Sequence, residues 1–535
     1  MKIRLAQKQF RVGDFTFNYN QILSTLANAE EQGDDLIVFP ELALSGYYHR
    51  DLIFSPLFYE RISSNLKKIL SIRTQVAIIL GLPLQENGEF FNSAILIENS
   101  RITATYKKRN FPPYENFEED RFYKKGQQSS LFKFRELAIG IGICHDMWAE
   151  VDNYEEEPDL FLIISASPYR QFQPEKRLKQ ARSWIKKRKI PLIYLNMIGA
   201  EDGVTFDGGS FLLDREGKIR EKASHFKEEE IQVDLKKIDQ YPIRGPFPKP
   251  SREELNWEAI TFAIKEFVCA HKFERVILGL SGGIDSALVL ALAVASLGRE
   301  NTFALFLPSK ITSKISYEIA EEQTKKLEVK MITYPIDEIL SSYTKILGTN
   351  QIDQRAIENL QARIRANIIM EQAARHSALV LNTTNKSEAA VGYGTIYGDM
   401  IGAFAPILDL YKTMVYKLAE FSKTRGFYIP ERAYTREPTA ELSYGQLDRS
   451  ELPPYHELDP ILASLLGEAT NSIKPGKESL CKKIRSLINR SEHKRIQAPI
   501  GVKLTTHSLN TNDRRIPLAG LARIEKNYSF RDSKE

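Results

Sequence analysis

The sequence of 535 residues has few cysteines and no long apolar run. Its three cysteines, Cys144, Cys269 and Cys481, are too few for a disulfide framework, which favours a reducing compartment. No apolar run approaches the ~20 residues that span a bilayer, and the first residues lack the apolar segment of a secretory signal. We therefore expect a cytoplasmic protein without a membrane segment.

A strong excess of one charge is also missing. The net charge of +5 comes from 74 basic and 69 acidic residues, with no dominant basic tail. Because nucleic-acid binding usually leaves a basic face or tail, we expect no nucleic-acid partner. The pattern G-x-x-x-x-G-K-[ST] is absent as well, which excludes a phosphate loop of the Walker A type.

The chain is too long for one hydrophobic core, because single cores stop growing at roughly 250–300 residues. Its first part has many strand-like runs with amphipathic helices between them, which predicts a layered α/β sandwich. The expected strands are residues 34–42, 76–84, 92–98, 102–108, 136–144, 159–167, 191–199 and 209–214. Residues 236–252 contain four prolines and a glycine, which predicts an extended linker. We expect domains at residues 1–240 and 256–535, with a linker at residues 241–255.

The second part alternates helical stretches with buried strands, as in a doubly wound parallel sheet. Its expected strands are residues 275–281, 302–308, 330–336 and 378–384. Ligands of such sheets bind beyond the carboxyl ends of the strands. We therefore look for a ligand site after each of these runs.

The turn "SGGIDS" follows the first of these strands and precedes an apolar helix. Gly282 and Gly283 allow a sharp turn with exposed N–H groups, and the hydroxyls of Ser281 and Ser286 add donors that suit an anion. A bare glycine pair would indicate only a tight βα turn, but Asp285 makes sense if a divalent cation bridges it to a phosphate. Glu388, which follows a later strand, can supply a second oxygen ligand for Mg²⁺.

This turn resembles the S-G-G-x-D-S loop of N-type ATP pyrophosphatases, and the motifs after it are similar to those of NAD synthetases. These motifs are "ENLQARIRANIIM", "NTTNKSEAAVGYGTIYGDMIGAFAPILDLYKTMV" and "REPTAELSYGQLDRSELPPYHELDPIL". The resemblance implies that Thr383 binds ATP and that Arg363, Glu388, Asp399 and Lys412 bind ATP or deamido-NAD. One departure is Thr384, which stands where the family usually has glycine.

Three other reactive side chains follow strands in the first part of the chain. A carboxylate at Glu41, an amine at Lys108 and a thiol at Cys144 would suit a nucleophilic amidase. A lone cysteine is more often a buried small apolar residue than a nucleophile, so this interpretation needs all three groups together.

The three groups resemble the Glu-Lys-Cys triad of the nitrilase, or carbon-nitrogen hydrolase, superfamily. "FPEL", "KRNFPPYENFEEDRFY" and "CHDMW" match its blocks, and this match implies Glu119 as an additional carboxylate. Tyr114 and Ser167 are candidates for the glutamine pocket. Two departures are His145 and Gly203, each of which stands where the family usually has glutamate.

The two halves together are similar to glutamine-dependent NAD synthetases. The resemblance implies an α-β-β-α nitrilase-like sandwich followed by a doubly wound, Rossmann-like domain of the adenine nucleotide alpha hydrolase type. It also implies a ligase that takes glutamine, ATP with Mg²⁺ and deamido-NAD, without a prosthetic group. A homo-oligomer follows from the resemblance alone.

Three alternatives stay open at this point. A different ATP-pyrophosphatase amidotransferase would make AMP without any need for deamido-NAD. A stand-alone amidase with a nucleotide-sensing second half would hydrolyse glutamine without making an amide. A tRNA-modifying enzyme would be expected to have a basic extension or paired cysteines, and neither is present.

Overall fold

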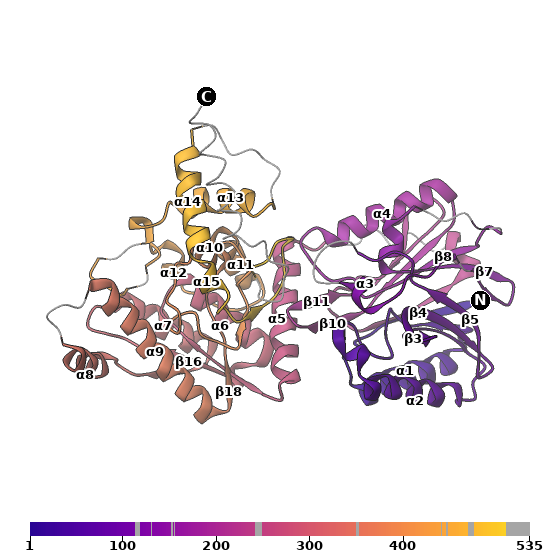
Figure 1. Cartoon of the computed structure of the whole chain (residues 1–535), viewed down its shortest axis with the longest axis horizontal. Helices are drawn as coiled ribbons and strands as arrows, with labels where there is room; N and C mark the ends of the chain where they lie inside the picture. Colours follow the sequence, from indigo (N-terminus) through magenta and orange to yellow (C-terminus); the bar gives the residue numbers. More distant parts are fainter. Residues whose placement is uncertain are drawn as a thin grey trace. The chain divides into compact units, whose positions relative to one another are not determined.

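The computed structural model describes most of the chain. The described residues are 1–112, 118–129, 131–150, 154, 156–240, 249–348, 353–439, 441–445, 448–468 and 476–509. They form two compact units, Met1–Pro250 and Ser251–Glu535 (Figure 1). Each unit is described by itself.

The first unit contains two six-stranded sheets. One has the order β14-β1-β2-β3-β4-β5 and the other the order β13-β12-β9-β8-β7-β6. The strands of the first sheet are β1 Lys2–Gln7, β2 Leu36–Val38, β3 Ala77–Glu86, β4 Glu89–Glu98, β5 Arg101–Lys107 and β14 Glu229–Asp234. Those of the second are β6 Leu131–Phe134, β7 Leu137–Ile143, β8 Leu160–Ser165, β9 Leu192–Asn196, β12 Phe211–Leu213 and β13 Ile219–Lys222. A separate hairpin consists of β10 Ile198–Glu201 and β11 Val204–Asp207.

Alternating apolar residues hold the two sheets together. On β7, Ile139, Ile141 and Ile143 share one buried cluster with Leu5 and Val38 of the other sheet. The glycines between these isoleucines lie against Phe161 and Ile163 of β8. Strand residues two apart share a face, so this spacing places the isoleucines between the sheets.

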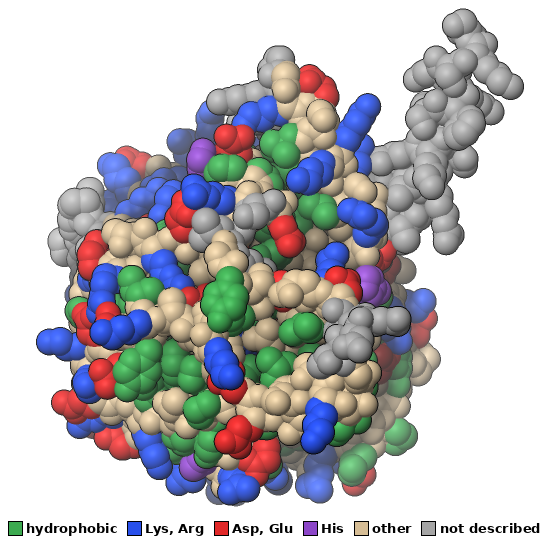
Figure 2. All heavy atoms as spheres, turned by 90° about the vertical axis from the view of Figure 1, so that its left-hand side faces the viewer, with side chains coloured by type: hydrophobic (Ala, Val, Ile, Leu, Met, Phe, Trp, Pro, Cys, Tyr) green, Lys and Arg blue, Asp and Glu red, His purple; other side chains and the backbone are tan. Residues whose placement is uncertain are grey.

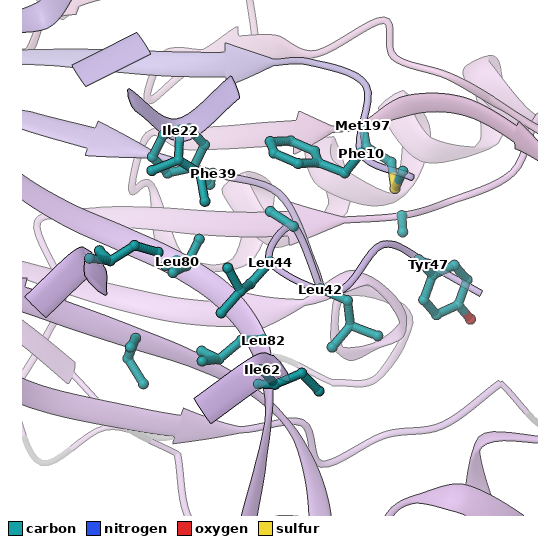
Figure 3. Packing of buried hydrophobic residues seen from close by; sticks show 14 of the residues in the cluster. Phe10, Ile22, Phe39, Leu42, Leu44, Tyr47, Ile62, Leu80, Leu82 and Met197 are labelled. Carbon is teal, nitrogen blue, oxygen red and sulfur yellow. The ribbon is translucent and has the colours of Figure 1, made fainter. Parts of the chain in front are cut away.

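Helices cover the outer face of each sheet. Ile22 of α1 and Ile62 of α2 pack on Phe39 and Leu80 of the first sheet (Figure 3). Trp184 of α4 packs on the second sheet. The helices are α1 Phe15–Gln32, α2 Pro56–Leu70, α3 Glu119–Phe122 and α4 Gln173–Arg188, with 3₁₀ turns η1 Arg50–Phe54, η3 Cys144–Trp148 and η4 Leu235–Gln240. The predicted α-β-β-α sandwich is confirmed.

The second unit is built on a four-stranded parallel sheet of order β17-β16-β15-β18. Its strands are β15 Arg275–Gly279, β16 Thr302–Phe306, β17 Lys330–Thr333 and β18 Ala378–Val380. The chain runs outward from β15 and then returns to β18 on its other side, which is the doubly wound arrangement. A short pair, β19 Phe404–Ala405 and β20 Ile500–Gly501, adjoins the end of β18 through a parallel bridge between Leu381 and Phe404.

Helices pack on both faces of this sheet. The helix α6 is buried along most of its length and contacts β15, β16, α5 and α11, whereas α9 contacts β15 and β18. The helices are α5 Arg252–Ala270, α6 Ile284–Leu297, α7 Lys314–Leu327, α8 Asp337–Leu347, α9 Gln354–His376, α10 Lys386–Val391, α11 Lys412–Thr424, α12 Glu431–Thr435, α13 Tyr455–Leu465, α14 Glu478–Arg490 and α15 Glu492–Arg495, with 3₁₀ turns η5 Arg299–Asn301 and η7 Asp448–Ser450. The predicted doubly wound domain is confirmed.

Two further features concern the predicted linker and the surface. The prediction of an extended chain from residue 236 is wrong at its start, because η4 places a 3₁₀ turn there, and residues 241–248 lie outside the described residues. Helix α8 has no buried residue, and Figure 2 shows apolar side chains among charged ones on the face that includes it. Within the described residues, none of the helices has both the length and the apolarity that crossing a membrane requires.

Candidate active sites

The first candidate site lies where strands of both sheets in the first unit end. Glu41 lies in the turn after β2, Lys108 directly follows β5, and Cys144 directly follows β7. The Lys108 ammonium lies 2.8 Å from Glu41 Oε1 and 2.8 Å from Glu119, and all three side chains are buried. The structure thus brings the predicted carboxylates onto one buried cation.

Glu41 is held by its neighbours in the chain and by three donors. Leu42 and Leu44 are buried in the apolar cluster of Figure 3, and their packing fixes the backbone turn that contains Glu41. Glu41 Oε2 accepts from the backbone N–H of Ala166 at 2.7 Å. Glu41 Oε1 accepts from Lys108 and from the amide of Asn92, each at 2.8 Å. This carboxylate therefore has little freedom to turn.

The backbone at Cys144 has a positive φ of 45°, which residues other than glycine, asparagine and aspartate seldom adopt. Such strained positions are common at reactive residues. Asp146 stabilises the turn, because its carboxylate accepts from the N–H of Ile143 at 2.9 Å and from the N–H of Asn110 at 2.8 Å. Asp146 thereby links the thiol turn to the loop that follows Lys108.

Burial and nearby charge decide the protonation states of this site. Burial, together with Glu41, raises the pKa of the Cys144 thiol well above its usual range, and Lys108 only partly opposes this. Burial alone would lower the pKa of Lys108, but Glu119 and Glu41 outweigh it and raise this pKa. Burial also raises the pKa of Glu119 to about 6. The site therefore holds a neutral thiol beside a permanent cation and a carboxylate that can take a proton.

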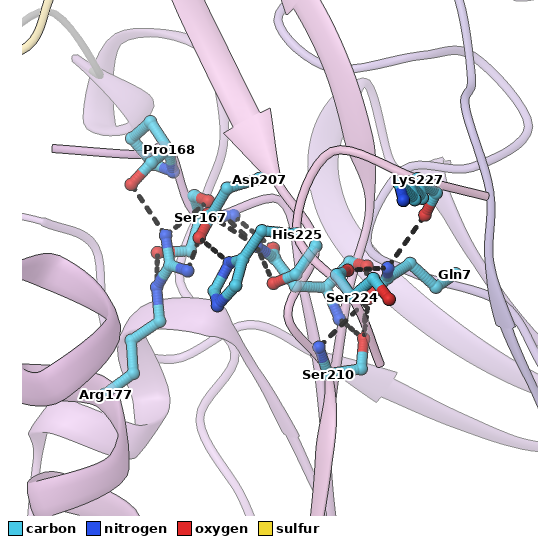
Figure 4. A network of polar contacts seen from close by, with 11 residues as sticks. Gln7, Ser167, Pro168, Arg177, Asp207, Ser210, Ser224, His225 and Lys227 are labelled. Atoms are coloured by element: carbon cyan, nitrogen blue, oxygen red, sulfur yellow. Dashed lines mark hydrogen bonds and ion pairs between the residues drawn. The ribbon is translucent and has the colours of Figure 1, made fainter. Parts of the chain in front are cut away.

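A polar network holds the loop after β8, where Ser167 lies (Figure 4). Arg177 Nη2 donates to the carbonyls of Ser167 at 2.8 Å and Pro168 at 2.7 Å, and Arg177 Nε donates to Ser167 Oγ at 3.1 Å. Asp207 pairs with Arg177 at 2.7 Å and with His225 at 2.9 Å. Motifs gave no signal for Arg177, which is buried although it lies on a polar helix. The other glutamine-pocket candidate, Tyr114, lies outside the described residues.

The second candidate site is a pocket of about 280 Å³ at the carboxyl ends of β15, β16 and β18. Ser281, Gly283, Asp285 and Ser286 line it, and α6 begins there with Gly283 at its N-cap. Gly282 has φ 80° and does not line the pocket, and a Cβ at this position would lie 2.5 Å from the carbonyl oxygen of Ser316. Only glycine fits there, so the sequence signal at Gly282 reflects a close backbone approach.

Lys412 joins the two predicted metal ligands. Its ammonium lies 2.5 Å from Asp285 Oδ2 and 3.1 Å from Glu388 Oε1. Asn385 donates to Asp285 Oδ1 at 2.9 Å and also accepts from the N–H of Glu388. Burial, with Asp285 and Asp448 nearby, raises the pKa of Glu388 to about 8. The sequence suggested that Lys412 faces a ligand, but it did not reveal this ion pair.

These carboxylates suit Mg²⁺. Magnesium is usually bound through one or two carboxylates together with substrate phosphates and water. Asp285 and Glu388 converge on one cation, the Lys412 ammonium, so two carboxylates that could bind a metal lie together at this pocket. No group of three or more possible metal ligands occurs in the part of the chain that the structure describes. The site therefore fits a metal that arrives with a phosphate ligand.

The other predicted contacts divide into those inside and outside this pocket. Thr383 and Asp399 line it. Arg363 does not; it is exposed and donates to the carbonyl of Ile396 at 3.2 Å. Arg365 lines the pocket instead, where it donates to the Leu307 carbonyl at 2.9 Å. The described residues place no carboxylate within ion-pair distance of Arg365, so its charge is available to a ligand.

Local geometry accounts for two of the three departures from the family patterns. Asp202 and Gly203 both have positive φ, at 48° and 80°, in the two-residue turn of the β10–β11 hairpin, where glycine is favoured. Thr384 does not have a positive φ, and its N–H donates to Asn382 Oδ1 at 2.8 Å, so threonine fits this loop. At His145, burial lowers the pKa to about 4, which leaves the ring neutral near pH 7.

Comparisons with known proteins agree with the division of the chain into two units. A carbon-nitrogen hydrolase family model matches residues 2–243, and an NAD synthase family model matches residues 256–498. The glutamine-dependent NAD(+) synthetase of Thermotoga maritima is 34% identical over 97% of this chain and 98% of its own length. That of Synechocystis sp. is 35% identical over 97% and 98%.

Two solved structures are similar over nearly the whole chain. The glutamine-dependent NAD+ synthetase of Acinetobacter baumannii, determined with adenosine diphosphate, has a TM-score of 0.76 at 31% identity and covers 97% of this chain and 98% of its own. The one from Cytophaga hutchinsonii has a TM-score of 0.83 at 19% identity, covers 98% of both chains, and supports the fold alone.

The fold and the two sites define a two-domain enzyme in which a carbon-nitrogen hydrolase unit precedes an NAD synthase unit. The extent of the match to curated relatives narrows this class further. The chain belongs to the glutamine-dependent NAD(+) synthetase family.

Proposed function

We propose that the first unit releases ammonia from glutamine through Cys144, Glu41 and Lys108. Glu41 takes the thiol proton as sulfur attacks the carboxamide carbon, because the high pKa of Cys144 keeps the free thiol protonated. Lys108, a cation held between two carboxylates, stabilises the oxyanion. Ammonia leaves with the proton from Glu41, and water then hydrolyses the thioester to glutamate.

Around this triad, Glu119 and the loop at Ser167 have supporting roles. Glu119 shares Lys108 with Glu41 and accepts from Tyr47 at 3.0 Å, so it keeps the ammonium in place and charged. The loop that contains Ser167 also supplies the Ala166 N–H that holds Glu41. Bound glutamine would therefore lie beside a loop that is itself fixed by Arg177.

In the second unit, we propose that the nicotinate carboxylate of deamido-NAD attacks the α-phosphate of ATP and releases pyrophosphate. The turn from Ser281 to Ser286 offers N–H groups, hydroxyls and the N-terminus of α6 to the phosphates. Ammonia then attacks the acyl-adenylate to give NAD and AMP. Thr383, Asp399 and Lys412 line the same pocket and are proposed to bind the nucleotide substrates.

Asp285 and Glu388 would hold Mg²⁺, which when bound neutralises charge on the pyrophosphate leaving group. Because Lys412 lines the pocket, its ammonium could leave these carboxylates and bind phosphate oxygens once Mg²⁺ is bound. The resemblance-based role of Arg363 toward ATP or deamido-NAD, a cytoplasmic location and a homo-oligomeric assembly all stay predictions.

The observation that supports the proposal most directly is the pair of lysine-dicarboxylate clusters, one beside a thiol and one in a phosphate-type pocket. An isotope experiment tests it. With ATP, deamido-NAD and amide-¹⁵N glutamine in the presence of unlabelled ammonium, we expect ¹⁵N in the carboxamide of NAD and one AMP for each NAD. AMP formation without deamido-NAD would favour another amidotransferase, and glutamine hydrolysis without any amide product would favour a nucleotide-sensing amidase.

A further inference from the structure

Asn92 is a buried polar residue on β4 that no motif identified. Its side-chain amide donates to Glu41 Oε1 at 2.8 Å, and its backbone carbonyl accepts from the N–H of Lys108 at 2.8 Å. The residue is fully buried. A single strand residue thus bonds to both the carboxylate and the amine of the first site.

The other atom of the amide shows what fixes its orientation. Asn92 Oδ1 is buried and has no hydrogen-bond partner among the residues that the structure describes. A carboxylate can only accept, so the NH₂ end must face Glu41 even though this leaves the oxygen unsatisfied. Asn18, by contrast, bonds through both ends of its amide, to the backbone of Arg11 and Leu44.

Three donors from three segments therefore hold the Glu41 carboxylate. Lys108 and Asn92 bond to Oε1, and the Ala166 N–H bonds to Oε2. Without Asn92, Oε1 would keep one donor, the Lys108 ammonium, which Glu119 also binds, and the carboxylate could turn about its hydrogen bond at Oε2. A general base that turns away from its proton loses rate even if substrate still binds.

We propose that Asn92 is a positioning residue for glutamine hydrolysis, which holds the Glu41 carboxylate in the orientation that receives the Cys144 proton. This inference rests on the proposed roles of Glu41 and Cys144. It predicts a defect in the glutaminase rate with little change in glutamine KM, and no defect in the use of added ammonium.

Two variants test this role in the full-length enzyme. Asn92→Ala removes the donor, and we expect kcat for glutamine hydrolysis to fall about 10–100-fold, as misplacement of a reacting group does. Asn92→Asp has almost the same size but replaces the donor with a second carboxylate. Because a like charge disfavours the ionised form of its neighbour, we expect the acid limb of the kcat/KM profile to move to higher pH as well.

The control is Asn18→Asp, which puts the same chemical change at a buried asparagine that bonds only to backbone groups. We expect its pH profile to match the parent enzyme even if its melting temperature falls. The charged or titratable groups that act on Glu41 or share its site are Tyr47, Lys108, Glu119, Tyr123, Cys144 and His145. Neither Asn92→Asp nor Asn18→Asp replaces any of these groups.

The outcomes separate this inference from the proposed function. Normal glutamine kinetics and an unmoved acid limb in Asn92→Asp would overturn the role of Asn92. An equal loss of glutamine- and ammonium-dependent NAD formation would overturn it too, because a positioning role at Glu41 cannot affect added ammonium. Glu41→Gln is measured in parallel: if it hydrolyses glutamine normally, the proposed triad itself is wrong, whereas its inactivity beside normal Asn92 variants contradicts only the present inference.

Discussion

Both candidate sites hold a buried lysine between two carboxylates, yet the two clusters differ in their access to solvent. Lys108 and its partners Glu41 and Glu119 are at most 2% exposed. Lys412 is equally buried, but Asp285 and Glu388 are 17% and 16% exposed, at the wall of a pocket. The same three-charge arrangement is closed in one unit and open in the other.

The difference shows how one charge pattern can serve two kinds of chemistry. In the closed cluster the carboxylates are shielded from solvent and held by further hydrogen bonds, so they are suited to act as fixed groups beside Cys144. In the open cluster the carboxylates can bind a metal ion and the ammonium can bind a phosphate. Burial of the carboxylates, rather than the identity of the residues, distinguishes the two sites.

The largest expected effect comes from removing each lysine. We expect Lys108→Met to lower glutamine-dependent NAD formation about 10²–10³-fold, as loss of an oxyanion donor does, while the ammonium-dependent rate persists. Lys412→Met should lower both rates. Initial rates with each nitrogen donor provide the measurement, and the persistent ammonium rate of Lys108→Met shows that the chain is folded. If Lys108→Met lost the ammonium-dependent rate as well as the glutamine-dependent rate, the assignment of the two clusters to separate reactions would be contradicted.

A smaller effect, on the KM for ATP, is expected from replacing Arg365 in the open site. Its guanidinium has no ion-pair partner among the described residues and should bind an anionic group of the nucleotide, and such a hydrogen bond contributes about 1.5–3 kcal/mol. We therefore expect Arg365→Met to raise the KM for ATP about tenfold or more with either nitrogen donor. The matched variant Arg363→Met removes an arginine outside this pocket, so we expect a smaller change in the KM for ATP. An equally large change would contradict the assignment of Arg365 to the nucleotide.

The closed site is expected to have a pH dependence near pH 6 that comes from Glu119. Since burial raises the pKa of Glu119 to about 6, its carboxylate takes a proton as the pH falls through 6, and Lys108 then loses one of its two partners. We expect glutamine hydrolysis to fall on that side of the profile, whereas Glu119→Gln should be slower at pH 7 and lack this step. A profile of Glu119→Gln that keeps the step near pH 6 would assign it to another group.

The smallest effect tests turn geometry near the closed site. Gly203 has φ 80° in the β10–β11 turn, where a side chain costs about 1–2 kcal/mol. We expect Gly203→Glu, which restores the residue usual in the family, to lower the free energy of unfolding by about this amount with unchanged rates for both donors. Thermal or denaturant unfolding measures it, and an increase in stability would show that the turn has been described wrongly.

The sequence predicted the layers of both units because strand ends are visible as apolar runs that stop at polar residues, and such stops also led to the proposed site residues. Glu41, Lys108 and Cys144 follow strand ends, and Asp285 lies in the first turn of α6, just after the turn that follows β15. The supporting residues gave no comparable signal. Asn92 lies within a strand, and only the pairing of β4 with its neighbours brings it to Glu41.

Helical residues were harder still to assign. Arg363 and Arg365 are two positions apart on α9, so they point to nearly opposite sides of the helix, and the motif does not say which side faces the pocket. Lys412 and Asp285 are separated by 127 positions in the sequence, and their ion pair depends on how α11 packs against α6. Such pairings arise from tertiary packing, which spacing along the chain does not encode.

The central claim, that one unit makes ammonia and the other uses it, is tested most directly by a two-donor assay of Cys144→Ala and Asp285→Ala. We expect Cys144→Ala to form no NAD from glutamine but to form it from high ammonium chloride, and Asp285→Ala to fail with both. Glutamine-dependent synthesis by Cys144→Ala, or ammonium-dependent synthesis at the normal rate by Asp285→Ala, would contradict this account.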